Sequence, residues 1–314
     1  MGKDLVSYLI FIIALVASFV LDLFVFSKKN KAVSIRSASY QYLFWVLISL
    51  AYCGFLWYEY DSKISLEFLS AYFMEMSLSI DNIFVFVMIF SSLQIQNQNV
   101  GRVLMIGVVL AILFRIIFIA IGIVLVQKFH FILYFFGAFL IFTGFKMFFE
   151  NQEEENDVKD GRLYKFIRRY LRYTDAEPHG KYLITKNGKS FFTKLALAVL
   201  IIGVTDIIFA LDSIPAVFAI TTNNLVVFSS NIFAVLGLRA LFFILQKAAD
   251  KFDFLQQGIA LVLILVGAKM FLELIHIHIP IWVSLVSILV CIGTSIVYSL
   301  YHNRKASKLE HHHD

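Results

Sequence analysis

The sequence predicts an all-α polytopic membrane protein with about nine transmembrane helices and two three-helix inverted repeats. Composition is the first reason: 60% of the residues are hydrophobic, only 16% are charged, and the mean hydropathy is +0.81. Soluble globular domains carry about 25% charged residues. The second reason is a series of apolar runs long enough to cross the ~30 Å hydrocarbon core of a bilayer. The third is a resemblance between the two halves of the chain.

The expected spans follow one another with short connections, apart from one long loop. They occupy residues 5–26, 40–58, 65–92, 102–126, 131–149, 193–221, 229–246, 255–275 and 280–301. The first two spans form an expected N-terminal region over residues 1–60, and the last lies within a C-terminal segment at 280–303. A loop fills 151–192, and 309–314 resembles the remnant of an expression tag. The first run is too long for a signal peptide, and its opening "MGKD" lacks a strongly basic start.

Lysine and arginine residues sort to one side of the expected membrane. With the N-terminus outside, the loops on one side hold 20 of them, and the loops on the other side hold only Lys3, Lys63 and Lys128. The positive-inside rule makes the basic side cytoplasmic, which places the C-terminus inside. This arrangement accounts for the net charge of +5 without a nucleic-acid partner. The partner it does imply is the lipid bilayer, and the sequence sets no oligomeric state.

The two halves of the chain match at two places. The stretch "EMSLSIDNIFVFVMI" from residue 75 aligns with "DIIFALDSIPAVFAI" from residue 206, and "GFKMFFE" at 144–150 aligns with "GAKMFLE" at 267–273. The units are therefore 65–150 and 193–273, with three spans each. An odd number of spans followed by a cytoplasmic loop inserts the second unit in the opposite sense. Inverted repeats of this kind are typical of secondary transporters, whose binding site lies near the midplane between the repeats.

Four acidic residues fall near the middle of the expected membrane: Glu75, Asp81, Asp206 and Asp212. A charged side chain at this depth costs at least about 2.5 to 3.5 kcal/mol, so its presence indicates a function. Pro215 is expected to free the carbonyl of Leu211 and to break the helix beside Asp212. Carboxylates, an amide, hydroxyls and freed carbonyls form an oxygen-rich set that suits Mg²⁺, Ca²⁺ or Mn²⁺.

The expected charges leave room for a cation. Arg115 and Arg239 lie mid-span, and their two positive charges reduce the four negative charges to −2, which matches one divalent ion or two protons. They serve as charge-compensating residues in this interpretation. The alternative is a structural network of salt bridges, which the cost of two uncompensated carboxylates disfavours.

Several other polar residues are candidates for supporting roles. On the third expected helix, Ser79 and Asn82 share a face with Glu75, whereas Met74 and Met88 share a face with Asp81. Lys146 and Lys269 lie near span ends, where they can snorkel, and each has a glutamate four residues on. We expect them to belong to gates on opposite sides. Asp22 is either a secondary ligand or an interfacial cap, and His276 with His278 forms either an outer metal site or a solvated turn.

The remaining features exclude other classes of protein. The cytoplasmic loop contains a basic amphipathic stretch, "RLYKFIRRYLRY", which we expect on the inner leaflet, and an Asn187-Gly188 hairpin signal. Cys53 and Cys291 lie singly in apolar spans and form no visible redox pair. The sequence has no Walker loop, no Ser/His/Asp grouping and no dinucleotide signature, so we expect no enzyme activity.

The paired motifs "EMSLSIDNIFVF" and "DIIFALDSIPAVFAIT", with the two "KMF" segments, resemble the TerC family of integral membrane proteins, and "LDLFVF" resembles its Alx branch. The resemblance covers roughly residues 15 to 300. It implies a transporter associated with manganese export and tellurite resistance, with some members described as redox modulators. It also implies that Glu75, Asp81, Asp206 and Asp212 are the functional acids, with Asn82 and Ser213 as their neighbours.

These observations together predict a secondary transporter in the bacterial inner membrane. It would export Mn²⁺ by alternating access, and because the emptied site would take up protons, we expect exchange for protons. Two alternatives remain: a non-transporting component of tellurite or envelope stress resistance, and a membrane redox modulator.

Overall fold

The computed structural model describes most of the chain. It covers residues 3–21, 34–129, 131–149, 172–174, 180–186, 189–246, 254–274, 277 and 279–310; within helices and strands, the side chains of residues 3–5, 18–21, 81, 84, 186, 212, 273, 274, 281 and 303–310 lie outside the description. The expected basic helix of the loop, Asp22, Glu150, His276 and His278 also lie outside it.

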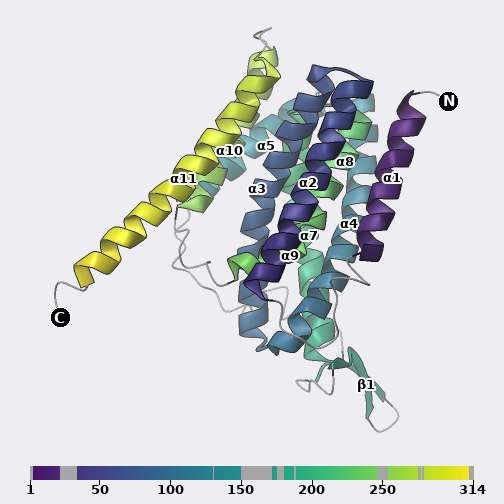
Figure 1. Cartoon of the computed structure of the whole chain (residues 1–314), viewed down its shortest axis with the longest axis vertical. Coiled ribbons are helices and arrows are strands. Elements are labelled where there is room, and N and C mark those ends of the chain that lie inside the picture. Colours follow the sequence, from purple (N-terminus) through teal and green to yellow (C-terminus); the bar gives the residue numbers. More distant parts are fainter. Residues whose placement is uncertain are drawn as a thin grey trace.

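The described chain is a helical bundle with one small hairpin (Figure 1). Its elements are α1 (Lys3–Leu21), α2 (Ile35–Glu59), α3 (Ser62–Ser92), α4 (Asn97–Lys128), α5 (Ile132–Phe149), β1 (Leu183–Lys186), β2 (Lys189–Phe192), α7 (Lys194–Phe218), α8 (Asn224–Leu236), α9 (Leu238–Leu245), α10 (Leu255–Leu274) and α11 (Ile281–Glu310). Figure 1 shows α3, α7 and α8 near the centre, α1 along one side, and α11 leaning away on the other side.

The helices confirm the all-helical membrane class. Within the described residues, seven helices are long and apolar enough to cross a membrane, or eight if α8 and α9 form one span bent by 41°. The first expected span, 5–26, corresponds to α1 (Lys3–Leu21), of which Val6–Ala17 is the apolar part with described side chains.

The outer surface of the bundle is apolar, as a bilayer requires. On α4 the exposed side chains recur every three or four residues: Val109, Leu113, Ile117, Ile121 and Val124. This spacing places them on one face of the helix. The opposite face of α4 is buried and includes Arg115. The helix therefore turns its aliphatic face outward to lipid and its charged residue inward.

Two apolar clusters fill the interior at different levels. One is formed chiefly by α3, α7, α8 and α10, and includes Met74, Val217 and Val226. The other surrounds the end of the bundle near the hairpin, and includes Phe86, Leu104 and Phe242. Each cluster fills the interior of the bundle at its own level and excludes water there.

Helices α5 and α10 approach one another so closely that glycine is required. A Cβ at Gly267 would lie 2.7 Å from the Gly137 carbonyl oxygen, and a Cβ at Gly144 would lie 2.8 Å from the Ala260 carbonyl oxygen. Moving seven residues forward on α5 moves the contact seven residues back on α10, so the two helices are antiparallel. Small residues at such crossings are how membrane helices pack without a hydrophobic driving force.

We expect Gly267→Ala to lower the thermal stability of the purified protein. The new methyl group would meet a backbone carbonyl that cannot move aside, and overpacking of this kind costs about 1–3 kcal/mol. Gly293→Ala on α11 is the matched control, because a Cβ there meets nothing within 4 Å. Thermal unfolding in detergent measures both. Equal melting temperatures for the two variants would show that the α5–α10 crossing can accommodate an additional methyl group.

Three local expectations changed in the structure. Pro215 does not break its helix: α7 continues to Phe218, so the proline removes one hydrogen bond within the final turn. The break occurs instead at Gly237, between α8 and α9. Helix α11 runs to Glu310, beyond the expected span and into the supposed tag remnant.

The hairpin signal was correct. Strands β1 and β2 pair antiparallel, with Lys186 opposite Lys189, so Asn187 and Gly188 form the two-residue connection; these two residues lie outside the description. The hairpin is fixed to the bundle because Thr193 donates its backbone N–H to the carbonyl of Tyr182 at 3.0 Å. The same end of the bundle therefore holds the start of α7 and the hairpin (Figure 1).

Candidate central ion site

Four helices bring polar side chains together in the middle of the bundle. Glu75 comes from α3, Arg115 from α4, Asp206 from α7 and Asn231 from α8, and each is 0% or 1% exposed. We call these four residues the central ion cluster. The two acids come from matching positions of the two sequence repeats, so residues 131 positions apart meet because α3 packs against α7.

Arg115 is the hub of the central ion cluster. Its Nη1 forms an ion pair and a hydrogen bond with Oε2 of Glu75, and also donates to Oδ1 of Asn231 at 3.1 Å. Its Nε lies 3.6 Å from Oδ2 of Asp206. Asn231 is held in this orientation because its Nδ2 donates to the carbonyl of Val227 at 3.0 Å, which turns Oδ1 toward the guanidinium. One guanidinium therefore connects α3, α7 and α8.

The cluster holds more acceptor atoms than it uses. Within the described residues, several buried side-chain atoms near these levels of α3 and α7 have no hydrogen-bond partner. They are Oε1 of Glu75, Oδ1 and Oδ2 of Asp206, and the hydroxyls of Ser79 and Ser213. The amide nitrogen of Asn82 is also unpartnered. Buried polar groups are normally satisfied, and an exception calls for an explanation such as an ion or water.

The unpartnered groups lie on matching faces of the two helices. Asn82 follows Glu75 by seven residues on α3, and Ser213 follows Asp206 by seven residues on α7, so each pair shares one helix face. Glu75, Arg115 and Asp206 together carry a net charge of −1. Hard oxygen donors with residual negative charge can bind a divalent cation or a proton.

The structure separates some of the predicted residues from this site. Because α3 is continuous, residue 81 lies about 240° around the helix from residue 75. The side chains of Asp81 and Asp212 lie outside the description. Met74 is buried in the apolar cluster, whereas Met88 is 39% exposed. Among the described side chains, no group of three or more His, Cys, Asp and Glu could hold a metal ion.

The predicted pairs of basic residues are not equivalent in the structure. Arg239 is buried on α9, just after the Gly237 break, whereas Arg115 lies in the middle of the unbroken helix α4. Lys146 is exposed near the end of α5 beside Phe145, but Lys269 is only 6% exposed on α10. The expectation that both lysines snorkel therefore fails for Lys269.

Asn231 was missed by the sequence interpretation. The expected span began at residue 229, which placed Asn231 at a helix end, where a polar residue needs no explanation. In the structure α8 begins at Asn224, so Asn231 lies two turns inside the helix. The available signal was a buried polar run, Ser229 to Asn231, inside an apolar stretch; all three residues are 0% exposed.

Comparisons with known proteins place these features in a family. Residues 60–307 match the family described as "Integral membrane protein TerC family". An uncharacterized membrane protein of Myxococcus xanthus is 40% identical over 300 residues, covering 96% of this chain and 92% of its own length. The Escherichia coli K12 protein named "Putative membrane-bound redox modulator Alx" is 40% identical over 262 residues, covering 81% of each chain. No solved structure matches.

Proposed function

We propose that this chain, which belongs to the TerC family of integral membrane proteins, is a secondary transporter that works by alternating access. It exports a divalent cation, and the proposed ion is Mn²⁺. The observation that carries the proposal is that buried carboxylate oxygens of Glu75 and Asp206 have no hydrogen-bond partner where α3 and α7 pack together, although Arg115 is ion-paired with both acids. Two negative charges against one guanidinium favour an additional cation. The choice of Mn²⁺ over Ca²⁺ or Mg²⁺ rests on the family resemblance.

Reciprocal packing supports an inverted pair of repeats. In the sequence alignment, Gly144 is equivalent to Gly267, and Gly137 is equivalent to Ala260. One close contact joins Gly137 to Gly267, and the other joins Gly144 to Ala260. Replacing each residue of one contact with its equivalent in the other repeat gives the other contact. Likewise α3 packs on α8, as α4 packs on α7. Such exchange is what a two-fold axis between the repeats would produce.

The proposed orientation puts the hairpin end in the cytoplasm of the inner membrane. Basic residues near that end, such as Arg102, Arg172 and Lys181, favour this side by the positive-inside rule. The opposite end, which holds the start of α3 and the turn between α7 and α8, then faces outward. In this proposal the described structure is occluded, because Glu75 and Asp206 are 0% exposed.

Redox modulation is the second candidate, since several relatives are named "Putative membrane-bound redox modulator Alx". The two cysteines of the sequence are free thiols on α2 and α11, and the Cys53 Sγ lies 3.1 Å from the Ser65 hydroxyl. Dithiol exchange requires two thiols that meet. The described contacts of these cysteines do not bring the two thiols together.

We expect calorimetry to detect Mn²⁺ binding to the purified protein with release of protons. In this proposal protons and the metal ion share the same carboxylate oxygens, so metal binding displaces protons from them. Titration at one pH in buffers of different ionisation enthalpy should then give different heats. Ca²⁺ and Mg²⁺ serve as comparison ions. Equal heats in all buffers would exclude proton exchange, and no heat with any of the three ions would contradict the metal site.

A further inference from the structure

We infer that Glu67 and Thr221 form an outer gate for the ion route, in which Glu67 carries the cation when the gate is open and is held by Thr221 when it is closed. This inference rests on the proposed transport function. It assigns a role to two residues that lie outside the central ion cluster.

A second carboxylate is buried on the helix that carries Glu75. Glu67 is 9% exposed and lies eight residues before Glu75 on α3, which is about 12 Å along the helix and about 80° around it. The two acids therefore lie on the same side of α3 at different depths. Glu67 is therefore a mostly buried carboxylate near the outer end of α3, on the side that leads toward Glu75.

Glu67 is tied to the helix that carries Asp206. The Thr221 hydroxyl donates to Oε2 of Glu67 at 2.5 Å, and Thr221 lies just beyond the end of α7. The helices α3 and α7 are therefore bridged twice: at the centre through Arg115, and at the outer end through a hydroxyl. Within the described residues, the printed hydrogen bond of the Glu67 carboxylate comes from a neutral hydroxyl, and the basic side chain that lines the same cavity is Lys63, one turn earlier on α3.

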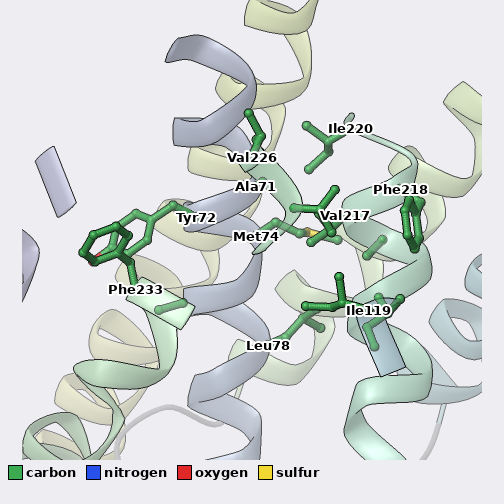
Figure 2. Packing of buried hydrophobic residues seen from close by; sticks show 14 of the residues in the cluster. Ala71, Tyr72, Met74, Leu78, Ile119, Val217, Phe218, Ile220, Val226 and Phe233 are labelled. Carbon is green, nitrogen blue, oxygen red and sulfur yellow. The ribbon is translucent and has the colours of Figure 1, made fainter. Parts of the chain in front are cut away.

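An apolar layer separates the two levels. Figure 2 shows Met74 of α3 pointing toward Val217 of α7, with Ile220 and Val226 on one side of this contact and Leu78 on the other. Met74, Val217 and Val226 are 0% exposed, and Ile220 is 6% exposed. A cation can cross this apolar layer only if the side chains of the layer move apart, because placing an ion in apolar surroundings is strongly unfavourable.

On the outer side of this layer, Glu67 faces an open cavity. The cavity has a volume of about 350 Å³ and is lined by Asp61, Lys63, Ile64, Glu67, Thr221, Thr222 and Asn223. Glu67 is therefore the carboxylate that links the outer solvent to the apolar layer. A cation arriving here from the centre would find the same oxygen that Thr221 occupies in the closed state.

Thr221 also fixes the turn that joins α7 to α8. Its hydroxyl oxygen accepts the backbone N–H of Asn223 at 3.1 Å, and Asn223 in turn caps α8 by accepting from Leu225 N at 3.0 Å. Helix α8 carries Asn231, which binds Arg115. Release of Thr221 from Glu67 would therefore loosen the turn above the apolar layer and the helix that supports the central ion cluster.

The test follows the accessibility of the apolar layer. A reporter cysteine at Ala71, which is 0% exposed and lies between Glu67 and Glu75, is placed in a chain whose Cys53 and Cys291 are replaced with alanine. A charged, membrane-impermeant maleimide is added to right-side-out or inside-out vesicles. We expect slow labelling in the parent, and labelling from the outer face about tenfold faster with Thr221→Val, since a hydrogen bond to a charged group shifts an equilibrium by about this factor.

Matched variants separate the hydrogen bond from general loosening. Thr221→Ser restores the hydroxyl and should restore slow labelling. Thr205→Val removes a hydroxyl of α7 that bonds only to its own helix, at the carbonyls of Ile201 and Ile202, and should leave labelling slow. Glu67→Gln can still accept from Thr221, so labelling stays slow, but loss of the carboxylate should reduce Mn²⁺ uptake into inside-out vesicles.

Three outcomes would overturn the gate: Thr221→Val labelling as slowly as Thr205→Val, labelling of Thr221→Val from the inner face, or unchanged Mn²⁺ transport by Glu67→Gln. Failure of transport itself has a different signature. A parent chain that moves no Mn²⁺, Ca²⁺ or Mg²⁺ contradicts the proposed function, whereas the labelling comparison needs no transported ion and still reports on the Glu67–Thr221 hydrogen bond.

Discussion

Asp206→Asn should abolish Mn²⁺ transport and Mn²⁺ binding while leaving the protein folded. The substitution keeps the shape of the side chain but removes one of the two negative charges described around Arg115. Glu75 and Arg115 then form a neutral ion pair, so the site loses the excess negative charge that attracts a cation. We expect Glu75→Gln to act in the same way, since Asp206 would then pair with Arg115.

Stability should respond in the opposite direction to function. Both carboxylates have buried oxygens without hydrogen-bond partners, so neutralising one of them removes a cost of burial. The melting temperature of Asp206→Asn should therefore equal or exceed that of the parent. Ser77→Ala is the control on α3, because its hydroxyl bonds only to the Phe73 carbonyl of its own helix, at 2.6 Å.

Transport into proteoliposomes and thermal unfolding are the two measurements. We expect the same loss of transport for Asp81→Asn and Asp212→Asn, whose side chains lie outside the described residues. Normal Mn²⁺ transport by Asp206→Asn or Glu75→Gln would show that these carboxylates are structural. A variant that loses both transport and its cooperative unfolding transition would indicate that the acids hold the helices together.

Much of the bundle could be predicted because hydropathy and helix geometry act locally. The expected span at 65–92 corresponds to α3, which begins only three residues earlier, at Ser62. The sequence also singled out Glu75 and Asp206 as buried acids, and in the structure both lie beside Arg115. These features depend on burial and periodicity, which a sequence displays directly.

The asymmetry of the central ion cluster could not be predicted. The alignment offers Arg115 and Arg239 as equivalent residues, and nothing in their own neighbourhoods decides which of them bridges Glu75 and Asp206. The surroundings of the two arginines differ: α4 is continuous, whereas α8 and α9 meet at a 41° bend at Gly237. That bend depends on packing against other helices, including the Tyr42 ring, which lies 3.3 Å from a Cβ built at Gly237.

Arg115→Gln should have the largest effect on stability of any substitution in the central ion cluster. Arg115 is 1% exposed, and its removal leaves Glu75 and Asp206 buried without a compensating charge. Breaking a buried ion pair by deleting one partner costs about 3–5 kcal/mol. Arg102→Gln is the matched control, because it makes the same change on the same helix at an exposed position.

Added Mn²⁺ should reverse this loss, because a divalent cation supplies two positive charges where the guanidinium supplied one. The melting temperature of Arg115→Gln should therefore rise more with Mn²⁺ than that of the parent, in which Arg115 competes for the same oxygens. Combining Arg115→Gln with Asp206→Asn should recover part of the stability and remove the response to Mn²⁺, since one carboxylate remains. If Mn²⁺ stabilises the parent and Arg115→Gln equally, Arg115 does not compete with the ion, and alternating occupancy of the site by guanidinium and metal must be abandoned.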